Sequence, residues 1–253
     1  TLSSSSAASD VYKRQVGDRV LNDLKAFTYS ITKKDWEVTV EVSRDDIEYD
    51  QIGLVKPRVQ QMAVESETHY DEMLFELIES NAVCYDGRAM FAIDHNIGGV
   101  AYSNLGSAVL STASALAART QMKSLVSDGG KSLKLKPTLL MVPPELEVEA
   151  KRICTNEKLV VGGVEVENDA KGLFDYIVID DLTDANAWYL LDVSKPIKPF
   201  IVQKNKPIEF VAMDSVTDEN VFMRKSYRYG VDSQDNAGFG LWQLAYKSTG
   251  TGA

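Results

Sequence analysis

The alternation of apolar and polar residues near the start of the chain predicts an extended arm. Every second residue from Trp36 to Val42 is apolar, which is the period-two pattern of a half-buried strand over Asp35–Ser43. Ala26–Ile31 also favours an extended conformation, and the short polar segment Thr32–Asp35 is suited to a hairpin loop. We therefore expect Ala26–Ser43 to form a β-hairpin.

The pattern then changes to that of a long amphipathic helix. Between Leu54 and Ser80, apolar residues recur at steps of three and four, which places them on one helical face. A helix of this length extends roughly 40 Å at the standard rise. We expect its other face to be solvated or to contact a partner, because it is acidic: it carries Glu65, Glu67, Asp71, Glu72 and Glu76.

The middle of the chain predicts a compact α/β lobe. Ser111 or Thr112 is suited to cap an Ala-rich helix that runs to about Val126. An apolar strand over Thr138–Val142 and a helix over Glu145–Cys154 follow, with prolines between them. The last third predicts mainly strands, at Tyr176–Asp180, Ala187–Asp192, Phe200–Lys204, Ile208–Ala212, Val221–Tyr229 and Phe239–Tyr246, with turns at Asp214–Asn220 and Asp232–Gly238.

Charge and composition narrow the class of protein. The 253 residues carry a net charge of −10, which disfavours binding to a phosphate backbone as the main activity. The two cysteines, Cys84 and Cys154, are too few for a disulfide framework or a zinc site, so a reducing cytoplasm is expected. No apolar run approaches the roughly 20 residues of a membrane helix, and no secretory signal is visible.

Candidate chemistry is sparse. Asp94-His95 is the only acid–imidazole neighbourhood, and we interpret His95 as a satisfied loop or core histidine rather than a general base. Ser127–Ser132 ends like a phosphate-binding loop but lacks the first glycine of that pattern. The acidic clusters at 180–184 and 214–219 lack calcium-loop spacing. We expect no catalytic, cofactor-binding or metal-binding site.

The first residues have an unusual composition. Ser5–Gln15 resembles the in-frame translation of a transposase adapter used in sequencing libraries. We therefore expect residues 1–15 to be a sequencing-adapter artefact, with natural sequence beginning at Val16 and an earlier part missing.

Several strings, taken together, resemble one known family, the major head subunits of Mu-like phages and prophages. Their fold is the tailed-phage major-capsid fold of the Hong Kong 97 type. The resemblance spans Val16 to Gly250 and rests on Val40–Glu48, Cys84–Gly87 with Phe91 and Asp94-His95, Trp188–Asp192, Glu219–Lys225, Tyr229–Asp232 and Gly240–Tyr246.

The resemblance implies an α+β fold with four parts after the artefact. Residues 16–44 would be the remnant of the hairpin called the E-loop. Residues 45–110 would form the peripheral P-domain, with the spine helix at 54–80. Residues 111–199 would form the axial A-domain, and residues 200–253 would return strands to both domains.

The resemblance also implies a structural role and not an enzymatic one. Copies of the chain would form hexamers and pentamers of an icosahedral head, in the virion and, during assembly, in the host cytoplasm. Expected partners are scaffold or protease, portal and decoration proteins, with packaged DNA enclosed but not specifically bound, and no membrane. No lysine–asparagine cross-link is predicted. Candidate intersubunit contacts are Lys33, Lys34, Trp36, Glu65, Arg224 and Arg228.

Three alternatives remain open at this point. An encapsulin, the shell of a cargo-loaded nanocompartment, would have a similar architecture. A hydrolase would use Asp94 and His95, and would lose turnover when His95 is replaced by alanine. A defective prophage relic would never assemble.

Overall fold

The computed structural model describes residues 2–4, 27–43, 45, 53, 55–161, 163–215 and 217–252. The chain divides into two compact units, each built from segments that are distant in sequence. Unit 1 comprises Thr1–Ser30, Leu77–Ile201 and Phe239–Ala253, and unit 2 comprises Ile31–Glu76 and Val202–Gly238. The predicted boundaries of the E-loop, P-domain and A-domain stay a prediction.

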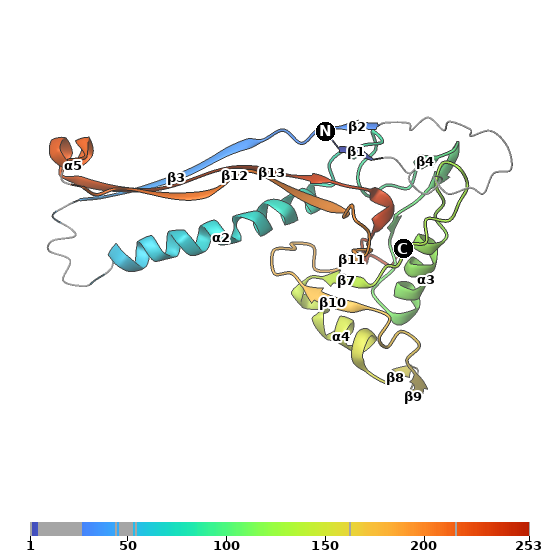
Figure 1. Ribbon diagram of the computed structural model, residues 1–253. Helices are drawn as coiled ribbons and strands as arrows, with labels where there is room; N and C mark the ends of the chain where they lie inside the picture. The colour runs from blue at the N-terminus through green and yellow to red at the C-terminus, as the bar shows by residue number, and fades with distance from the viewer. Residues whose placement is uncertain are drawn as a thin grey trace, which may run out of the picture. The chain divides into compact units, whose positions relative to one another are not determined.

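Unit 2 combines a long helix with a three-stranded sheet. The strand order is β12 (Phe200–Met213), β13 (Ser226–Phe239), β3 (Lys34–Ser43). β3 runs antiparallel to β13 in an unbroken register from Ser226 opposite Ser43 to Asp235 opposite Lys34. A short helix, α5 (Glu219–Arg224), joins β12 to β13 at one end of this ribbon, as Figure 1 shows.

The predicted strand near the start of the chain is confirmed, but its predicted partner is wrong. Alternating residues do form β3, yet β3 pairs with β13 and not with the segment Ala26–Ile31. Within that segment β2 (Phe27–Tyr29) pairs with β1 (Leu2–Ser4). β3 pairs with β13 because a short hairpin with Ala26–Ile31 would leave most of the backbone groups of β3 unpaired.

Two predictions for the last third are also wrong. Val221–Tyr229 is not one strand, because α5 occupies its first residues and β13 begins at Ser226. Asp232–Gly238 is not a turn but the second half of β13. Pairing with β3 supplies the backbone hydrogen bonds that outweigh the turn preference of its Asp, Asn and Gly residues.

β12 is one continuous strand where two were predicted. Pro207 lies in its middle and donates no backbone hydrogen bond, which would disrupt a central strand. β12 is an edge strand of its sheet, where a missing donor is tolerated.

The long helix is confirmed as α2 (Val55–Ser80), within one residue of the predicted start. Its apolar stripe buries Met73 and Ile78, while Glu65, Asp71, Glu72 and Glu76 are exposed as predicted. The helix contributes residues to both units.

Unit 1 contains a five-stranded mixed sheet in the order β10-β7-β11-β14-β6. β10 is parallel to β7, β11 is antiparallel to both of its neighbours, and β14 is parallel to β6. The helix α3 contacts β11 and β14, and α4 contacts β7 and β10. The strands of this sheet are β6 (Leu105–Gly106), β7 (Leu139–Val142), β10 (Asp175–Val178), β11 (Trp188–Leu191) and β14 (Ala245–Ser248).

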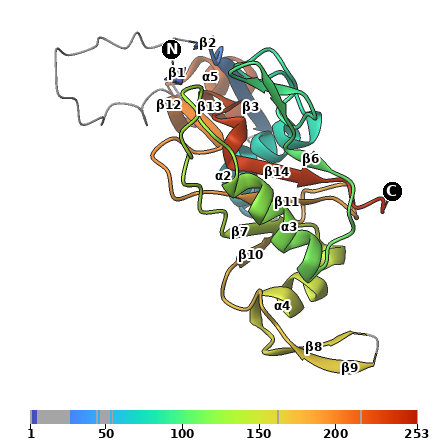
Figure 2. The ribbon, with the colours of Figure 1, turned by 90° about the vertical axis from the view of Figure 1, so that its right-hand side faces the viewer.

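Two α-helices, two short 3-10 helices and three two-stranded sheets complete the described part of unit 1 (Figure 2). The predicted helix after Ser111 is confirmed as α3 (Thr112–Lys123), capped by a reciprocal pair of bonds between Ser111 and Ser114. It ends earlier than predicted, because Val126 already bridges to Ser132 in the following turn. The remaining elements are η2 (Pro144–Leu146), α4 (Glu147–Thr155), η3 (Trp242–Leu244), the hairpin of β4 (His95–Ile97) and β5 (Val100–Tyr102), and that of β8 (Lys158–Val161) and β9 (Val164–Glu167).

The predicted strand Phe239–Tyr246 is therefore interrupted by η3, with β14 following it. Its aromatic residues are core residues, as predicted: Phe239 and Trp242 are almost completely buried, together with Trp188 and Tyr189. Gly240 lies beside them at a close backbone approach, since a Cβ there would overlap the carbonyl oxygen of Lys198.

Candidate intersubunit surface

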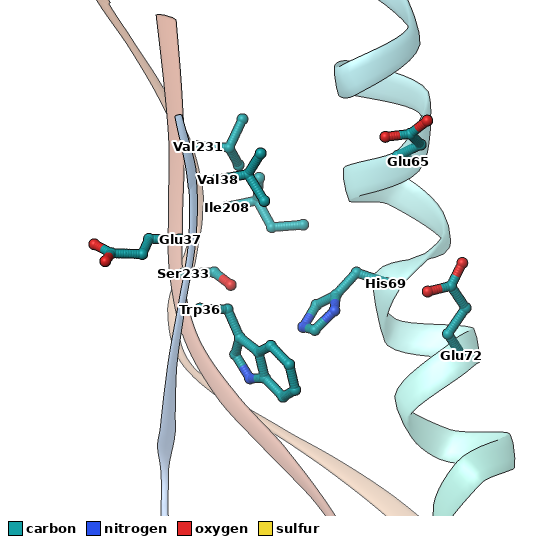
Figure 3. Close-up of a pocket in the computed structure, with 9 residues that line it drawn as sticks. All are labelled: Trp36, Glu37, Val38, Glu65, His69, Glu72, Ile208, Val231 and Ser233. Carbon is teal, nitrogen blue, oxygen red and sulfur yellow. The ribbon is translucent and has the colours of Figure 1, made fainter. Parts of the chain in front are cut away.

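An open pocket lies between α2 and the three-stranded sheet of unit 2 (Figure 3). Its volume is about 220 Å³. Trp36 and Val38 line it from β3, and their cross-strand partners Ser233 and Val231 line it from β13. These residues share one face of the sheet because side chains on a strand alternate. Val38 remains 56% exposed, so the chain itself leaves this apolar lining partly uncovered.

His69 faces this lining from α2. Its ring meets that of Trp36 edge-on, with 4.7 Å between the centroids. Its Nε2 atom lies 3.1 Å from Oδ1 of Asp235, a carboxylate that is completely buried. Within the described part of the chain, neither the second oxygen of Asp235 nor the indole nitrogen of Trp36 has a hydrogen-bond partner. The polar groups behind the pocket are therefore only partly satisfied.

Tyr70, next to His69, is held by an adjacent contact. Lys204 on β12 places its ammonium 3.6 Å from the centroid of the Tyr70 ring, a cation–π contact. Burial raises the pKa of the Tyr70 hydroxyl, and the charge of Asp235 raises this pKa further. A hydrogen bond to the backbone of Ile208 lowers the pKa, but the net shift is upward. The ring therefore stays neutral and fixes this stretch of α2 against the sheet.

The remaining residues of the pocket lining are Ile208 on β12 and three exposed glutamates. Glu65 and Glu72 extend from α2, whereas Glu37 on β3 points to the opposite face of the sheet, away from the pocket (Figure 3). Gln61 donates a hydrogen bond of 3.2 Å to Glu65. No lysine or arginine belongs to the pocket lining, so the pocket combines an apolar floor with a negatively charged rim.

A second exposed surface lies at the α5 end of the sheet. α5 buries Val221 and Asn220. The Asn220 amide donates hydrogen bonds to the carbonyls of Met213, the last residue of β12, and Ser226, the first residue of β13. The helix is thus fixed to the strands, while Phe222 and Met223 are 79% and 70% exposed. Exposed side chains near this pair are basic, acidic or apolar: Arg224, Lys225, Glu219, Asp214, Phe210, Val211 and Met213.

The structure separates the six predicted contact residues into three groups. Trp36 and Glu65 line the pocket, and Lys34 stands 5.8 Å from the Trp36 ring centroid. Arg224 lies on α5, exposed. The other two have partners within the chain: Lys33 pairs with Asp35 at 3.3 Å, and Arg228 pairs with Glu41, its cross-strand neighbour, at 3.2 Å.

Sequence reasoning missed several residues of these surfaces. His69 was visible only as a histidine within the helix, and Asp235 fell in a predicted turn. Phe222 and Met223 fell in a predicted strand, where alternation would bury one of them. Their exposure follows from α5, which no local pattern predicted.

The Asp94–His95 pair does not form a catalytic site. His95 is completely buried, and its Nδ1 lies 2.6 Å from Asp86 rather than from Asp94, which pairs with Arg88. Its ring stacks on Trp242 at 4.0 Å between centroids. The acid that adjoins His95 in sequence is therefore not its partner, and the interpretation of His95 as a satisfied core histidine is confirmed.

The structure also accounts for the other candidate features of the sequence. Ser127–Ser132 forms a tight turn in which Ser127 donates its backbone N–H to the carbonyl of Lys131, so the phosphate-loop resemblance is local only. Among the described residues, no group of three or more His, Cys, Asp or Glu side chains is arranged to hold a metal ion. Over the same residues, no helix has both the length and the hydropathy to span a membrane.

The family model and the curated relatives that match this chain by sequence are those of phage head proteins. The family described as "Mu-like prophage major head subunit gpT" matches residues 10–109, 100–182 and 178–251. The Mu-like prophage FluMu major head subunit of Haemophilus influenzae is 30% identical over 237 residues, which are 93% of this chain and 56% of that protein. The major capsid protein of Escherichia phage Mu is 28% identical over 235 residues, 92% of this chain and 56% of that protein. The chain thus spans somewhat over half the length of these relatives.

Solved structures agree with the sequence comparison. A chain of the bacteriophage JBD30 procapsid is 29% identical, with a TM-score of 0.52 over 94% of this chain and 58% of that one. A chain of the JBD30 capsid decorated with minor capsid protein trimers has a TM-score of 0.58 and 23% identity, covering 68% of this chain and 82% of that one. These likenesses confirm the predicted α+β capsid fold of the Hong Kong 97 type.

The family match extends over most of the sequence and is to structural capsid proteins rather than enzymes. It favours the phage head over the encapsulin and hydrolase alternatives. This chain belongs to the Mu-like prophage major head subunit family.

Proposed function

We propose that the chain is the shell-forming subunit of a Mu-like phage head, in which copies join into rings and the rings into a closed icosahedral shell around DNA. The observation that carries this proposal is the family match along nearly the whole sequence, together with likeness to a procapsid chain at 29% identity. The partly uncovered pocket and the exposed α5 end in unit 2 add support, because a subunit of a shell needs surfaces that only another copy covers.

The assembly would rest on many weak contacts. In a ring each subunit uses one surface toward the preceding copy and a different surface toward the next. Contacts that are weak one by one become lasting when each subunit makes several at once. The net charge of −10 suits a wall that must not hold the enclosed DNA tightly.

We assign the parts by analogy with the capsid fold. Residues 16–44 would be the E-loop remnant, whose strand β3 pairs with β13 of the same chain, and 45–110 the P-domain with the spine helix at 54–80. Residues 111–199 would lie near the ring axis as the A-domain, with 200–253 returning to both. The division of the chain into two units, one around α2 with the long strands and one around the five-stranded sheet, supports two domains of this kind.

Other proteins would take part. The JBD30 capsid carries trimers of a minor capsid protein, and we infer that a decoration protein also binds the shell built by this chain. A scaffold or protease and a portal complete the expected set.

The test is to express the chain as its natural gene encodes it, with its scaffold, and to examine the product by negative-stain electron microscopy. We expect rings or closed shells. A product that stays monomeric at all concentrations, with and without scaffold, would refute the proposal.

A further inference from the structure

Both uncovered surfaces of unit 2 are apolar at their centres, and each carries charged side chains. The pocket between α2 and the sheet is concave, apolar at its floor and acidic on its helix side, where Glu65 and Glu72 lie. The α5 end is a projection that presents Phe222 and Met223, with Arg224 and Lys225 on their C-terminal side and Glu219 one turn before them. The apolar pair matches the apolar floor, and the two cations can meet the glutamates of α2.

One chain cannot bring these surfaces together by itself. The pocket includes Ser233 and the α5 end begins before Ser226, and both positions lie on the unbroken strand β13. Seven residues of strand hold them about 24 Å apart at the usual rise. β13 is held along this stretch by its ladder with β3, so bending it would break paired backbone groups. Only a second molecule can supply an α5 to the pocket.

We propose that α5 of one copy docks into the pocket of a second copy, with Phe222 or Met223 against Trp36 and Val38, and Arg224 near the glutamates of α2. This inference rests on the proposed function and specifies one of its intersubunit contacts. The contact joins two different surfaces, so it is heterologous, and its repetition produces a ring or an open chain of subunits.

The side chains on both sides suit such a contact. Met223 has an unbranched, adaptable side chain that fills irregular apolar spaces. Arg224 can donate several hydrogen bonds in a planar array to a carboxylate, and Glu65 and Glu72 offer two carboxylates on the same helix face. α5 itself needs no rearrangement to dock, because Asn220 already fixes it to the ends of β12 and β13.

Cysteine cross-linking in assembled particles tests this contact. Glu72→Cys places a thiol on the pocket rim and Met223→Cys places one on α5. The native thiols Cys84 and Cys154 are buried and do not interfere. A short bifunctional thiol reagent should convert a chain with both substitutions into a ladder of covalent multimers. Co-assembly of the two single variants should give dimers and nothing larger, because each chain then has one reactive site.

Controls separate this contact from other arrangements. Val164→Cys lies on an exposed position of β9, 63% exposed, and combined with Met223→Cys it should give no ladder. Efficient linking by Met223→Cys alone would show that α5 ends meet one another, and would overturn the proposal. Particles without a ladder, or a ladder equally strong with Val164→Cys, would overturn it as well. All three results would leave the proposed function standing, whereas failure of the unsubstituted chain to form any particle would refute the function and this contact with it.

A charge exchange provides a second measurement. Arg224→Glu should lose most of the particles, as should Glu72→Arg, while the chain with both substitutions should recover them. Each variant should keep the denaturation midpoint of the unassembled subunit, since both positions are exposed. Equal particle yields from all four chains would contradict the docking.

Discussion

Asn104 holds together the loop around His95, and its replacement by alanine should destabilise unit 1 strongly. Its amide donates hydrogen bonds to the carbonyls of Met90 at 2.8 Å, Ala245 at 3.2 Å and Trp242 at 3.3 Å. Its Oδ1 accepts the backbone N–H of Ala92 at 2.9 Å. Asn104 is only 2% exposed, so water cannot replace these bonds when the side chain is removed.

The size of the effect follows from this geometry. Losing the bonds to the carbonyls of Met90 and Ala245 costs about 1 kcal/mol each, and leaving the part-buried N–H of Ala92 without an acceptor adds about 1–3 kcal/mol. We therefore expect Asn104→Ala to lower the free energy of unfolding by roughly 3–5 kcal/mol. Asn104→Asp should be at least as harmful at neutral pH, because a carboxylate oxygen would face the three carbonyls that now accept from the amide.

Urea denaturation of the unassembled subunit, followed by tryptophan fluorescence, measures the effect, since Trp242 stacks on His95 in the same network. Asn96→Ala is the matched control. Asn96 is exposed and accepts one backbone hydrogen bond, from Gly99, so its loss should cost at most about 1 kcal/mol. If Asn104→Ala were no worse than Asn96→Ala, the network would not have the structural role that we assign to it.

Three further predictions follow from buried groups. Gly240→Ala should prevent folding or cost several times more than Gly230→Ala in urea denaturation, because a Cβ at Gly240 would overlap the carbonyl of Lys198, whereas at Gly230 the nearest atom lies at 3.5 Å. Burial raises the pKa of the Cys84 thiol to about 12 and that of Cys154 to about 11. At pH 8 iodoacetamide should therefore label the folded chain on the order of a thousandfold more slowly than the unfolded chain, as mass spectrometry would show. Because both pKa values lie above that of an unfolded thiol, their contribution to stability is complete below about pH 8.5 and is lost as the pH rises toward 12, and a midpoint independent of alkaline pH would contradict this.

Elements determined by local pattern were predictable from sequence. The spacing of apolar residues in Leu54–Ser80 predicted α2, and the alternation in Asp35–Ser43 predicted β3, because each pattern encodes which face is buried. Strand partners were not predictable in the same way. β3 pairs with β13, which lies far along the chain, and the residue pattern of β3 does not indicate which strand is its partner.

Asp94, Asp86 and Asp235 show why the polar contacts were harder to predict. Asp94 adjoins His95 in sequence, but neighbouring residues on an extended chain point to opposite sides, so Asp86 is the partner instead. Asp235 looked like part of a polar turn because its neighbours favour turns. Its actual position is set by the ladder with β3 and by His69 on α2, and both contacts are distant in sequence.

The proposed contact between copies should be weak when only two copies make it. Burying one exposed Phe222 or Met223 side chain contributes about 1.5–3 kcal/mol, and an exposed ion pair adds at most about 1 kcal/mol. Association costs at least about 4 kcal/mol in lost freedom of motion, so two copies held by this contact alone would separate readily. In the proposed ring, a contact of this strength would let a wrongly placed subunit leave during assembly. Closing the ring would then give every subunit two such contacts at once, and only at that stage would the assembly become stable.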